Sequence, residues 1–224
     1  KMKKTMDSLV SGDRVEITST DPGFPRDAAA WCNSTGNQLI SKEAAGGKSV
    51  VVIEKGEPKS CNIVTSCEGK GKTFIMFSDD LDKALATFVL ANGAAATGQK
   101  VTIFFTFWGL NVIKKLHKPN VEKDIFGKMF GMMLPSSSRK LKLSKMSMGG
   151  IGGKMMRYIM NRKGIDSLES LRQQALENGV EFIACQMSMD VMGVKQEELL
   201  DEVTIGGVAT YMERADNANI NLFI

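Results

Sequence analysis

The stretch VTIFFT, residues 101–106, decides the fold of this chain. It carries no charge and is apolar or threonine at every position, so both faces of the strand that it predicts are buried. The runs TFIMFS (73–78) and VEFIA (180–184) resemble it, and helical patterns separate the three. Strands buried on both faces belong to a parallel sheet covered by helices on both sides, so we expect an α/β fold.

Outward from these strands the alternation continues. Leu81 to Thr97 is predicted as a helix, and a second helix ends near Gly179. The polar, Met-rich run after Cys185 is predicted as a turn. It is followed by a helix from Lys195 to Leu200, an apolar piece at 203–205, a helix through Tyr211 and the terminal strand NINLFI (219–224).

The first 56 residues follow another pattern. A helix ending near Gly12, a strand over 14–18, a helix from Pro25 and strands over 38–42 and 49–54 predict a small α+β unit in the order αβαββ. Residues 57–72 are rich in Gly, Ser and Lys, which is typical of a linker. We therefore expect domains over 1–56 and 73–224.

The composition is that of a soluble globular protein. The chain has 224 residues, of which 43% are hydrophobic and 24% are charged. No apolar run reaches the roughly 18 residues that a membrane-spanning helix needs, and the regions of a secretory signal are missing. Four cysteines without such a signal suggest a reducing compartment, so we expect a cytoplasmic protein.

A basic insert interrupts the second domain. Between Lys114 and Lys163 there are 13 Lys and Arg against two acidic residues, a local charge of +11, whereas the rest of the chain carries −7. The insert, residues 118–163, could be a mobile loop, wrap a neighbouring subunit, or lie on an anionic membrane surface. In the last case the shallow apolar anchor would be Met129, Phe130, Met132, Met133 and Leu134. Nucleic acid is not an expected partner, because the basic residues alternate with Met and Gly rather than with stacking aromatics.

In a parallel sheet, ligands and chemistry collect at the carboxyl ends of the strands. Reading these ends off the sequence gives one cluster of predicted site residues. They are Ser78, Asp79, Thr106, Trp108, Cys185, Gln186, Gly206 and Gly207. Cys185 is the candidate reactive group and the others line the predicted pocket. A helix beginning near Cys185 would favour its thiolate form.

Cys185 also has a structural interpretation. The end of a buried strand needs a small apolar residue, and a cysteine fills that place without reacting. No Lys, Arg or His lies within nine residues on either side, and the nearest charges, Glu181 and Asp190, are acidic. From position alone the inert interpretation is favoured.

The remaining features have simpler explanations than catalysis. Trp108 suits the core or an oligomer contact better than ligand stacking, and Ser78 with its two following aspartates suits a helix cap. The pair Gly206 and Gly207 lacks the full pattern of a nucleotide-binding loop. One histidine and no Cys-x-x-Cys pair predict no metal or other cofactor. Cys61 and Cys67 are either two surface thiols or a regulatory disulfide.

Several motifs carry a resemblance to known families. FIACQMSMDVMG (182–193), FFTFWGLNVIKK (104–115) and VTIGGVATYMERADNANINLFI (203–224) make residues 73–224 similar to the DsrE/DsrF-like sulfur-transfer family, in its long, Met-rich branch. DPGFPRDAAAWCNSTGNQLI (21–40) makes residues 1–56 resemble the TusA (SirA-like) sulfur carriers. The first resemblance covers about two thirds of the chain, with its motifs in the same order and spacing.

The resemblance implies a flavodoxin-like α/β sandwich for the second domain, closed homo-oligomers, and a cysteine that carries sulfane sulfur as a persulfide. In this branch that cysteine is Cys185. The first domain departs from its family, because TusA-like proteins carry sulfur on a Cys-Pro-x-Pro motif after a first strand, and residues 1–56 have neither. Cys32 is then a packed core residue. The chain starts with Lys, which is consistent with a fragment of a longer protein.

Two functions follow as hypotheses. In the first, Cys185 accepts sulfane sulfur and passes it to another sulfur-transfer protein or to a low-molecular-weight thiol, which needs no metal. In the second, the domain is a non-catalytic module that oligomerises or docks on a membrane, and Cys185 is inert. A buried Cys185 sulfur would favour the second.

Overall fold

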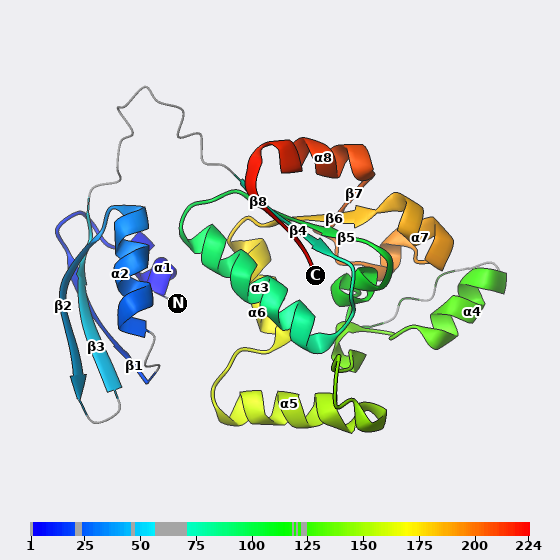
Figure 1. Ribbon diagram of the computed structural model, residues 1–224, viewed down its shortest axis with the longest axis horizontal. Coiled ribbons are helices and arrows are strands. Elements are labelled where there is room, and N and C mark those ends of the chain that lie inside the picture. The colour runs from blue at the N-terminus through cyan, green and yellow to red at the C-terminus, as the bar shows by residue number, and fades with distance from the viewer. Residues whose placement is uncertain are drawn as a thin grey trace. The chain divides into compact units, whose positions relative to one another are not determined.

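The chain folds into two compact units in the computed structural model (Figure 1). One comprises residues 1–68 with 96–98, and the other 69–95 with 99–224. The structure describes residues 2–20, 24–45, 48–56, 71–117, 119, 121 and 125–224. Most of the predicted linker lies outside these residues, so the predicted domain limits stay predictions.

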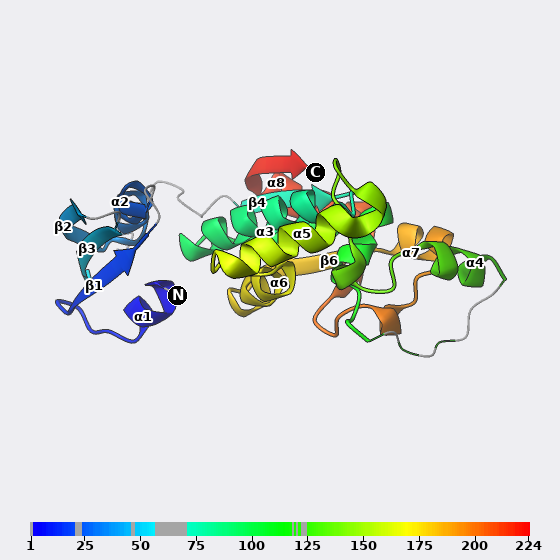
Figure 2. The same ribbon diagram turned by 90° about the horizontal axis from the view of Figure 1, so that it is seen from below.

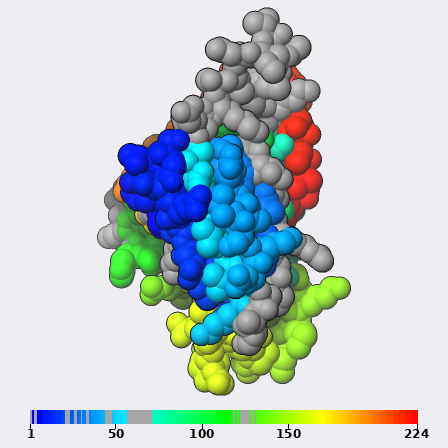
Figure 3. Space-filling model, turned by 90° about the vertical axis from the view of Figure 1, so that its left-hand side faces the viewer, coloured from blue at the N-terminus to red at the C-terminus, as the bar shows by residue number. Residues whose placement is uncertain are grey.

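The described residues of the N-terminal domain follow the predicted order αβαββ. The elements are α1 (Met2–Asp7), β1 (Arg14–Ser19), α2 (Phe24–Thr35), β2 (Gln38–Ala45) and β3 (Lys48–Glu54). β3 lies between β1 and β2 and pairs antiparallel with both. Figure 3 shows the surface of this domain in blue and cyan. Alternate residues of β3 point inward. The core therefore gathers Val51 and Ile53 with Met6, Trp31 and Cys32.

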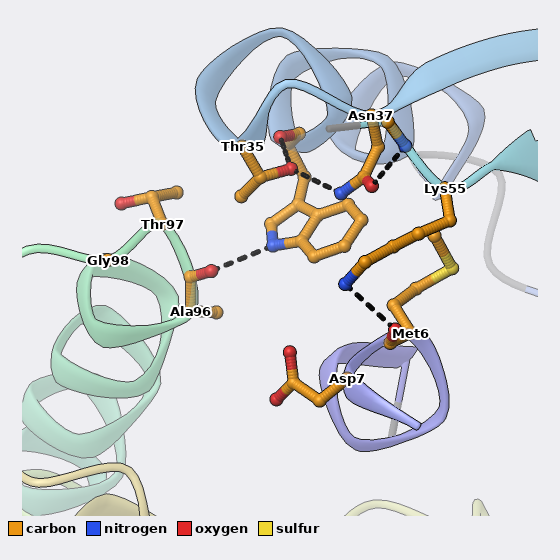
Figure 4. Close-up of a pocket in the computed structure, with 10 residues that line it drawn as sticks. Met6, Asp7, Thr35, Asn37, Lys55, Ala96, Thr97 and Gly98 are labelled. Atoms are coloured by element: carbon orange, nitrogen blue, oxygen red, sulfur yellow. Dashed lines mark hydrogen bonds between the residues drawn. The ribbon is translucent and has the colours of Figure 1, made fainter. Parts of the chain in front are cut away.

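Hydrogen bonds after β3 close this domain (Figure 4). Lys55 Nζ donates to the Met6 carbonyl oxygen at 2.9 Å, which ties the chain after β3 to α1. The Gly56 amide donates to Asn37 Oδ1 at 3.1 Å. A Cβ at Gly56 would lie only 1.8 Å from the Gly36 carbonyl oxygen. Glycine is therefore required at this position.

The C-terminal domain is built on a five-stranded sheet. Its strands are β4 (Gly71–Met76), β5 (Val101–Phe105), β6 (Glu181–Cys185), β7 (Thr204–Gly206) and β8 (Ala218–Phe223). They lie in the order β7-β6-β5-β4-β8, and every neighbouring pair is parallel. All five residues of the central strand β5 are buried. The predicted α/β class and flavodoxin-like sandwich are thus confirmed, in the sense of a parallel sheet between helical layers.

Helices cover the two faces of this sheet unequally. The chain steps from β4 through β5 and β6 to β7 in one direction and then returns across the sheet to β8. Because crossovers between parallel strands are right-handed, the return places its helix on the opposite face. Figure 1 shows α8 (Val208–Asp216) on one face, with α3 (Leu81–Ala96) and α6 (Leu168–Glu177) on the other.

The core divides in the same way. The main cluster, on the side of α3 and α6, includes Phe88, Phe105 and Phe182, whose ring centres lie 5.3 to 6.4 Å apart. A smaller cluster on the α8 side contains Phe104, Ile183, Cys185 and Tyr211. Successive residues of β5 and β6 therefore face different cores, as the alternation of side chains along a strand requires.

The insert forms short helices where the structure describes it. They are α4 (Ile125–Met133), the 3₁₀ turns η2 (Ser138–Lys140) and η3 (Met148–Gly150), and α5 (Ile151–Arg162). Within the described part of the chain, no helix combines the length and the apolar character needed to cross a membrane.

The helix predicted from Lys195 to Leu200 is wrong. Only the 3₁₀ turn η4 (Gln196–Glu198) forms there. The Lys115 amide donates to the Glu198 carbonyl oxygen at 2.8 Å, and the Leu200 amide donates to the Ile113 carbonyl oxygen at 3.1 Å. Pairing with this distant segment uses the backbone groups that a continuing helix would need, a choice that local sequence cannot foresee.

Gly109 is predicted to be essential for the junction after β5. A Cβ there would lie 1.9 Å from the Met76 carbonyl oxygen, whereas a Cβ at Gly93 on the exposed side of α3 meets nothing within 4 Å. We expect Gly109→Ala to lower the free energy of unfolding by about 1–3 kcal/mol through overpacking. Gly93→Ala should raise it by about 0.5–1 kcal/mol, because alanine is the better helix former. Urea unfolding of both variants is the measurement, and equal effects would contradict the prediction.

Candidate functional site

The four predicted loops lie at one edge of the sheet. β4 to β7 run in the same direction, so the residues that follow Met76, Phe105, Cys185 and Gly206 emerge together. Cys185 is the register partner of Gly206. The Thr106 amide donates to the Met76 carbonyl oxygen at 3.1 Å. The structure therefore brings these strand ends side by side.

Thr106 joins this edge to α7 (Gln186–Met192). Its hydroxyl lies 2.8 Å from Ser188 Oγ, and both residues are buried. The sequence predicts a turn after Cys185, but a helix begins there directly and ends at Gly193, which adopts a left-handed conformation. Ser188 is not among the predicted site residues, because only this helix brings its side chain to Thr106.

Asp79 and Asn111 form a polar pair at the same edge. Asn111 Nδ2 donates to Asp79 Oδ2 at 2.9 Å. Asn111 is fully buried, and its Oδ1 has no hydrogen-bond partner among the described residues. It lies in the 3₁₀ helix η1 (Phe107–Ile113), which follows β5. Asn111 is not among the predicted site residues, although a single amide inside the apolar run WGLNVI (108–113) is the feature that could have indicated it.

The surroundings of Asp79 raise the pKa of its carboxyl. Burial, the largest cause, disfavours the charged form, and the negative charge of Asp80 acts in the same direction. The hydrogen bond from Asn111 and the positive charge of Lys114 oppose the shift without cancelling it. Asp79 therefore holds its proton more tightly than an ordinary aspartate.

Ser78 and Asp80 organise the turn before α3. Ser78 Oγ donates to Asp80 Oδ2 at 2.8 Å and accepts from the Asp80 amide at 3.1 Å. Lys83 pairs with the Asp80 carboxylate at 2.8 Å. These contacts account for Ser78 and Asp80 by local structure, and the capping of α3 stays a prediction.

Cys185 is closed off from solvent. The residue is 2% exposed and packs with Phe104, Ile183 and Tyr211 beneath α8. Tyr211 closes this cluster, because its ring centre lies 5.2 Å from that of Phe104 and its hydroxyl lies 3.2 Å from Thr73 Oγ1. A sulfur donor cannot reach the thiol in this conformation. The burial favours the inert interpretation unless α8 moves.

The other predicted pocket residues differ in exposure. Trp108 is 43% exposed, and Gln186 is exposed as well. A Cβ at Gly206 would lie 2.8 Å from Ile183 Cγ2, whereas Gly207 has open space and is the N-cap of α8. Packing therefore explains Gly206, while Trp108 and Gln186 are surface groups beside the edge.

The other cysteines offer little to this edge. Cys32 is 1% exposed in the N-terminal core, where burial raises the pKa of its thiol, in agreement with the predicted packing role. Cys61 and Cys67 lie outside the described residues. Across the described ranges, no group of three or more His, Cys, Asp and Glu side chains is placed to hold a metal ion.

Comparisons with known proteins cover both units. Residues 69–223 match the DsrE/DsrF/DrsH-like family, and residues 1–55 match the family described as sulfurtransferase TusA. YrkE of Bacillus subtilis is 44% identical over 155 residues, which cover 69% of this chain and 97% of that protein. Sulfur carrier protein DsrE2 of Allochromatium vinosum is 38% identical over 161 residues, covering 70% and 99% respectively. Sulfur carrier protein TusA of the same organism is 38% identical over 53 residues, covering 24% and 70%.

Asp79→Asn is predicted to stabilise the protein at neutral pH. The variant removes a half-buried charge and adds an amide donor that can reach the unpartnered Asn111 Oδ1, a gain of about 1 kcal/mol. Because the folded-state pKa of Asp79 is raised, the wild type gains stability as pH falls through that pKa toward the unfolded-state value. The advantage of Asp79→Asn should therefore shrink in acid. Thermal unfolding of both proteins across pH tests this, and a difference that does not change with pH would contradict it.

Proposed function

The chain belongs to the DsrE/DsrF/DrsH-like family, and we propose on that premise that it is a sulfur-trafficking protein. The observation that carries the proposal is the 38% identity to a protein named sulfur carrier DsrE2 over 99% of that protein's length. The match of residues 1–55 to the TusA family points to the same process.

We assign the sulfur-carrying role to Cys185. The Cys185 thiolate attacks the outer sulfur of a persulfide or polysulfide donor, the donor's S–S bond breaks, and the donor leaves as a thiolate. The new S–S bond makes Cys185 a persulfide. An acceptor thiolate then attacks the outer sulfur and releases Cys185 as a thiolate. Oxidation states balance in each exchange, so the chemistry requires no redox cofactor.

Burial of Cys185 makes α8 the controlling element in this proposal. The thiol is buried in a cluster to which α8 contributes Tyr211, so in this proposal transfer requires a conformation in which α8 lifts from β6. If α8 never opens, the alternative function applies, and the domain is a non-catalytic module with Cys185 in its core. The buried position is the specific observation that favours this alternative.

The proposed partners follow from this chemistry. They are other sulfur-transfer proteins or low-molecular-weight thiols, further copies of the chain, and an anionic membrane surface reached through residues 118–163. We place the protein in the cytoplasm, at the periphery of that membrane. Residues 1–56 contain no Cys-Pro-x-Pro motif.

Polysulfide treatment is predicted to load Cys185. Mass spectrometry of peptides should show added sulfur on Cys185, and Cys185→Ser should abolish this uptake. A Cys61→Ser/Cys67→Ser double variant is the control and should retain it. Alkylation of Cys185 in the native protein should be slow and become faster in Tyr211→Ala, which loosens α8. Sulfur on Cys61 and Cys67 with none on Cys185, even in Tyr211→Ala, would refute the assignment.

A closed homo-oligomer is predicted from the β8 edge. Ile220 and Leu222 point to one face of this edge strand and are 42% and 40% exposed, and Phe223 is 68% exposed. Apolar side chains on an open strand edge favour pairing with another chain. Sedimentation at micromolar concentration should show more than a monomer, and Leu222→Lys should shift it toward the monomer. Val89→Lys, at a residue 56% exposed on α3, is the matched control. A wild-type monomer would contradict the prediction.

A further inference from the structure

α5 presents an apolar stripe to solvent on the side opposite its packed face. Its buried residues are Gly152, Gly153 and Met160. On the other side Ile151 is 64% exposed, Met155 47% and Tyr158 62%. At 3.6 residues per turn, positions 151, 155 and 158 form one continuous row about half a turn away from Gly153 and Met160.

Such a helix is unusual on a protein surface. A surface helix normally buries one apolar stripe and turns charged residues outward, whereas a helix that is apolar on both sides is covered on both sides. The loop before α5 extends the exposed apolar area, because Met146 is 69% and Met148 66% exposed. The outer side of α5 therefore exposes more apolar surface than water alone would favour.

Contacts of its inner side hold α5 firmly against the rest of the domain. Arg157 Nη1 donates to Glu169 Oε2 at 3.2 Å, and Arg157 Nη2 donates to the Ser138 carbonyl oxygen at 2.9 Å. Gly152 lies so close to the preceding loop that a Cβ would come within 2.1 Å of the Met146 carbonyl oxygen. The helix and the methionine loop are therefore one unit, fixed to η2 and α6 by its inner side.

The charge around the stripe has one sign. Residues 125–163 contain nine Lys and Arg and no Asp or Glu. Lys154 and Arg162 lie on α5 itself and are exposed, and Lys145 in the preceding loop is exposed as well. The surface thus combines protruding apolar side chains with a surrounding field of positive charge.

We propose that the outer stripe of α5, with Met146 and Met148, is a membrane-docking surface that inserts its apolar side chains at the interface of an anionic lipid bilayer. The lipid-facing row is Ile151, Met155 and Tyr158, and Lys145, Lys154 and Arg162 contact the headgroups. This combination is the one that interfacial helices use, with shallow apolar insertion and electrostatic attraction acting together. The inference rests on the membrane partner proposed above and is independent of the sulfur chemistry of Cys185.

The positive charge around α5 favours an anionic bilayer over a second copy of the chain as the partner of this surface. A second copy of this chain would bring the same acid-free basic segment against itself, and like charges would oppose the contact. An anionic bilayer offers negative headgroups and an apolar interior at the same surface. α5 differs from the sequence-predicted anchor at 129–134, because it places charge and apolar side chains on one fixed helix.

α5 and the helix that covers Cys185 lie on opposite sides of the sheet. α5 is the outermost element on the side of α3 and α6, and Figures 1 and 2 show it there from two directions. α8 covers the opposite face of the sheet, above Cys185. Docking through α5 therefore turns α8 toward the aqueous phase, where a thiol partner can reach it.

Vesicle flotation of the full chain tests this surface. Vesicles of equal parts phosphatidylglycerol and phosphatidylcholine should carry the protein, and phosphatidylcholine alone should carry it weakly. Ile151→Ser/Met155→Ser/Tyr158→Ser should reduce the partition coefficient at least about ten-fold. Lys154→Gln/Arg162→Gln should reduce it about five-fold for each charge removed, and added salt should act in the same direction. Val208→Ser/Met212→Ser is the matched control on α8, where these residues are 63% and 49% exposed, and it should bind as the wild type does.

Each other outcome overturns the inference in a recognisable way. Binding that survives the α5 triple variant but is lost in Met132→Ser/Met133→Ser places the anchor on α4 and leaves the membrane partner intact. Wild-type protein that does not float removes the membrane partner as well. An α5 variant that changes sedimentation without lipid identifies a second copy as the occupant. If the triple variant fails to fold, Tyr158→Trp tests the docking surface instead. The emission of the additional tryptophan should shift to the blue when anionic vesicles are added. The absence of a shift would refute docking through α5.

Discussion

Burial of β5 on both faces is the constraint on which the rest of the C-terminal domain depends. A strand without a solvent-facing side needs a neighbour on each edge and a cover on each face, so it demands both a parallel sheet and two helical layers. Right-handed crossovers then determine which helix covers which face. Because only the connection to β8 runs back across the sheet, α8 lies on the face away from α3 and α6.

This arrangement gives Cys185 its double character. As the last residue of β6 it lies at the carboxyl edge, where chemistry collects in parallel sheets. The alternation of side chains along β6 nevertheless turns it inward with Ile183, under the single helix α8. The position of Cys185 in the sheet favours a reactive thiol, whereas its packing favours an inert one. The two agree only if α8 opens, and the sulfur-carrier proposal therefore becomes a statement about the mobility of one helix.

The long connection between β5 and β6 adds a second outer surface on the opposite side of the domain. Its helix α5 is fastened through Arg157 and the two tightly packed glycines, which leaves its apolar row directed outward. Residues 125–163 of this connection concentrate positive charge without acidic residues. One insertion thus supplies a proposed lipid contact without altering the strand ends at which the proposed sulfur chemistry occurs.

The sequence is enough to predict the α/β class, the αβαββ order of the first domain and the strands that end at the predicted site. These follow from short-range periodicity and burial, which a single strand or helix already expresses. Other features of the site and the fold become visible only in the folded chain. The pairing of Asn111 with Asp79, the contact of Ser188 with Thr106 and the loss of the helix at 195–200 each depend on a segment distant in sequence. The burial of Cys185 in one cluster with Tyr211 has the same cause, because the face that α8 covers depends on the direction of the crossover.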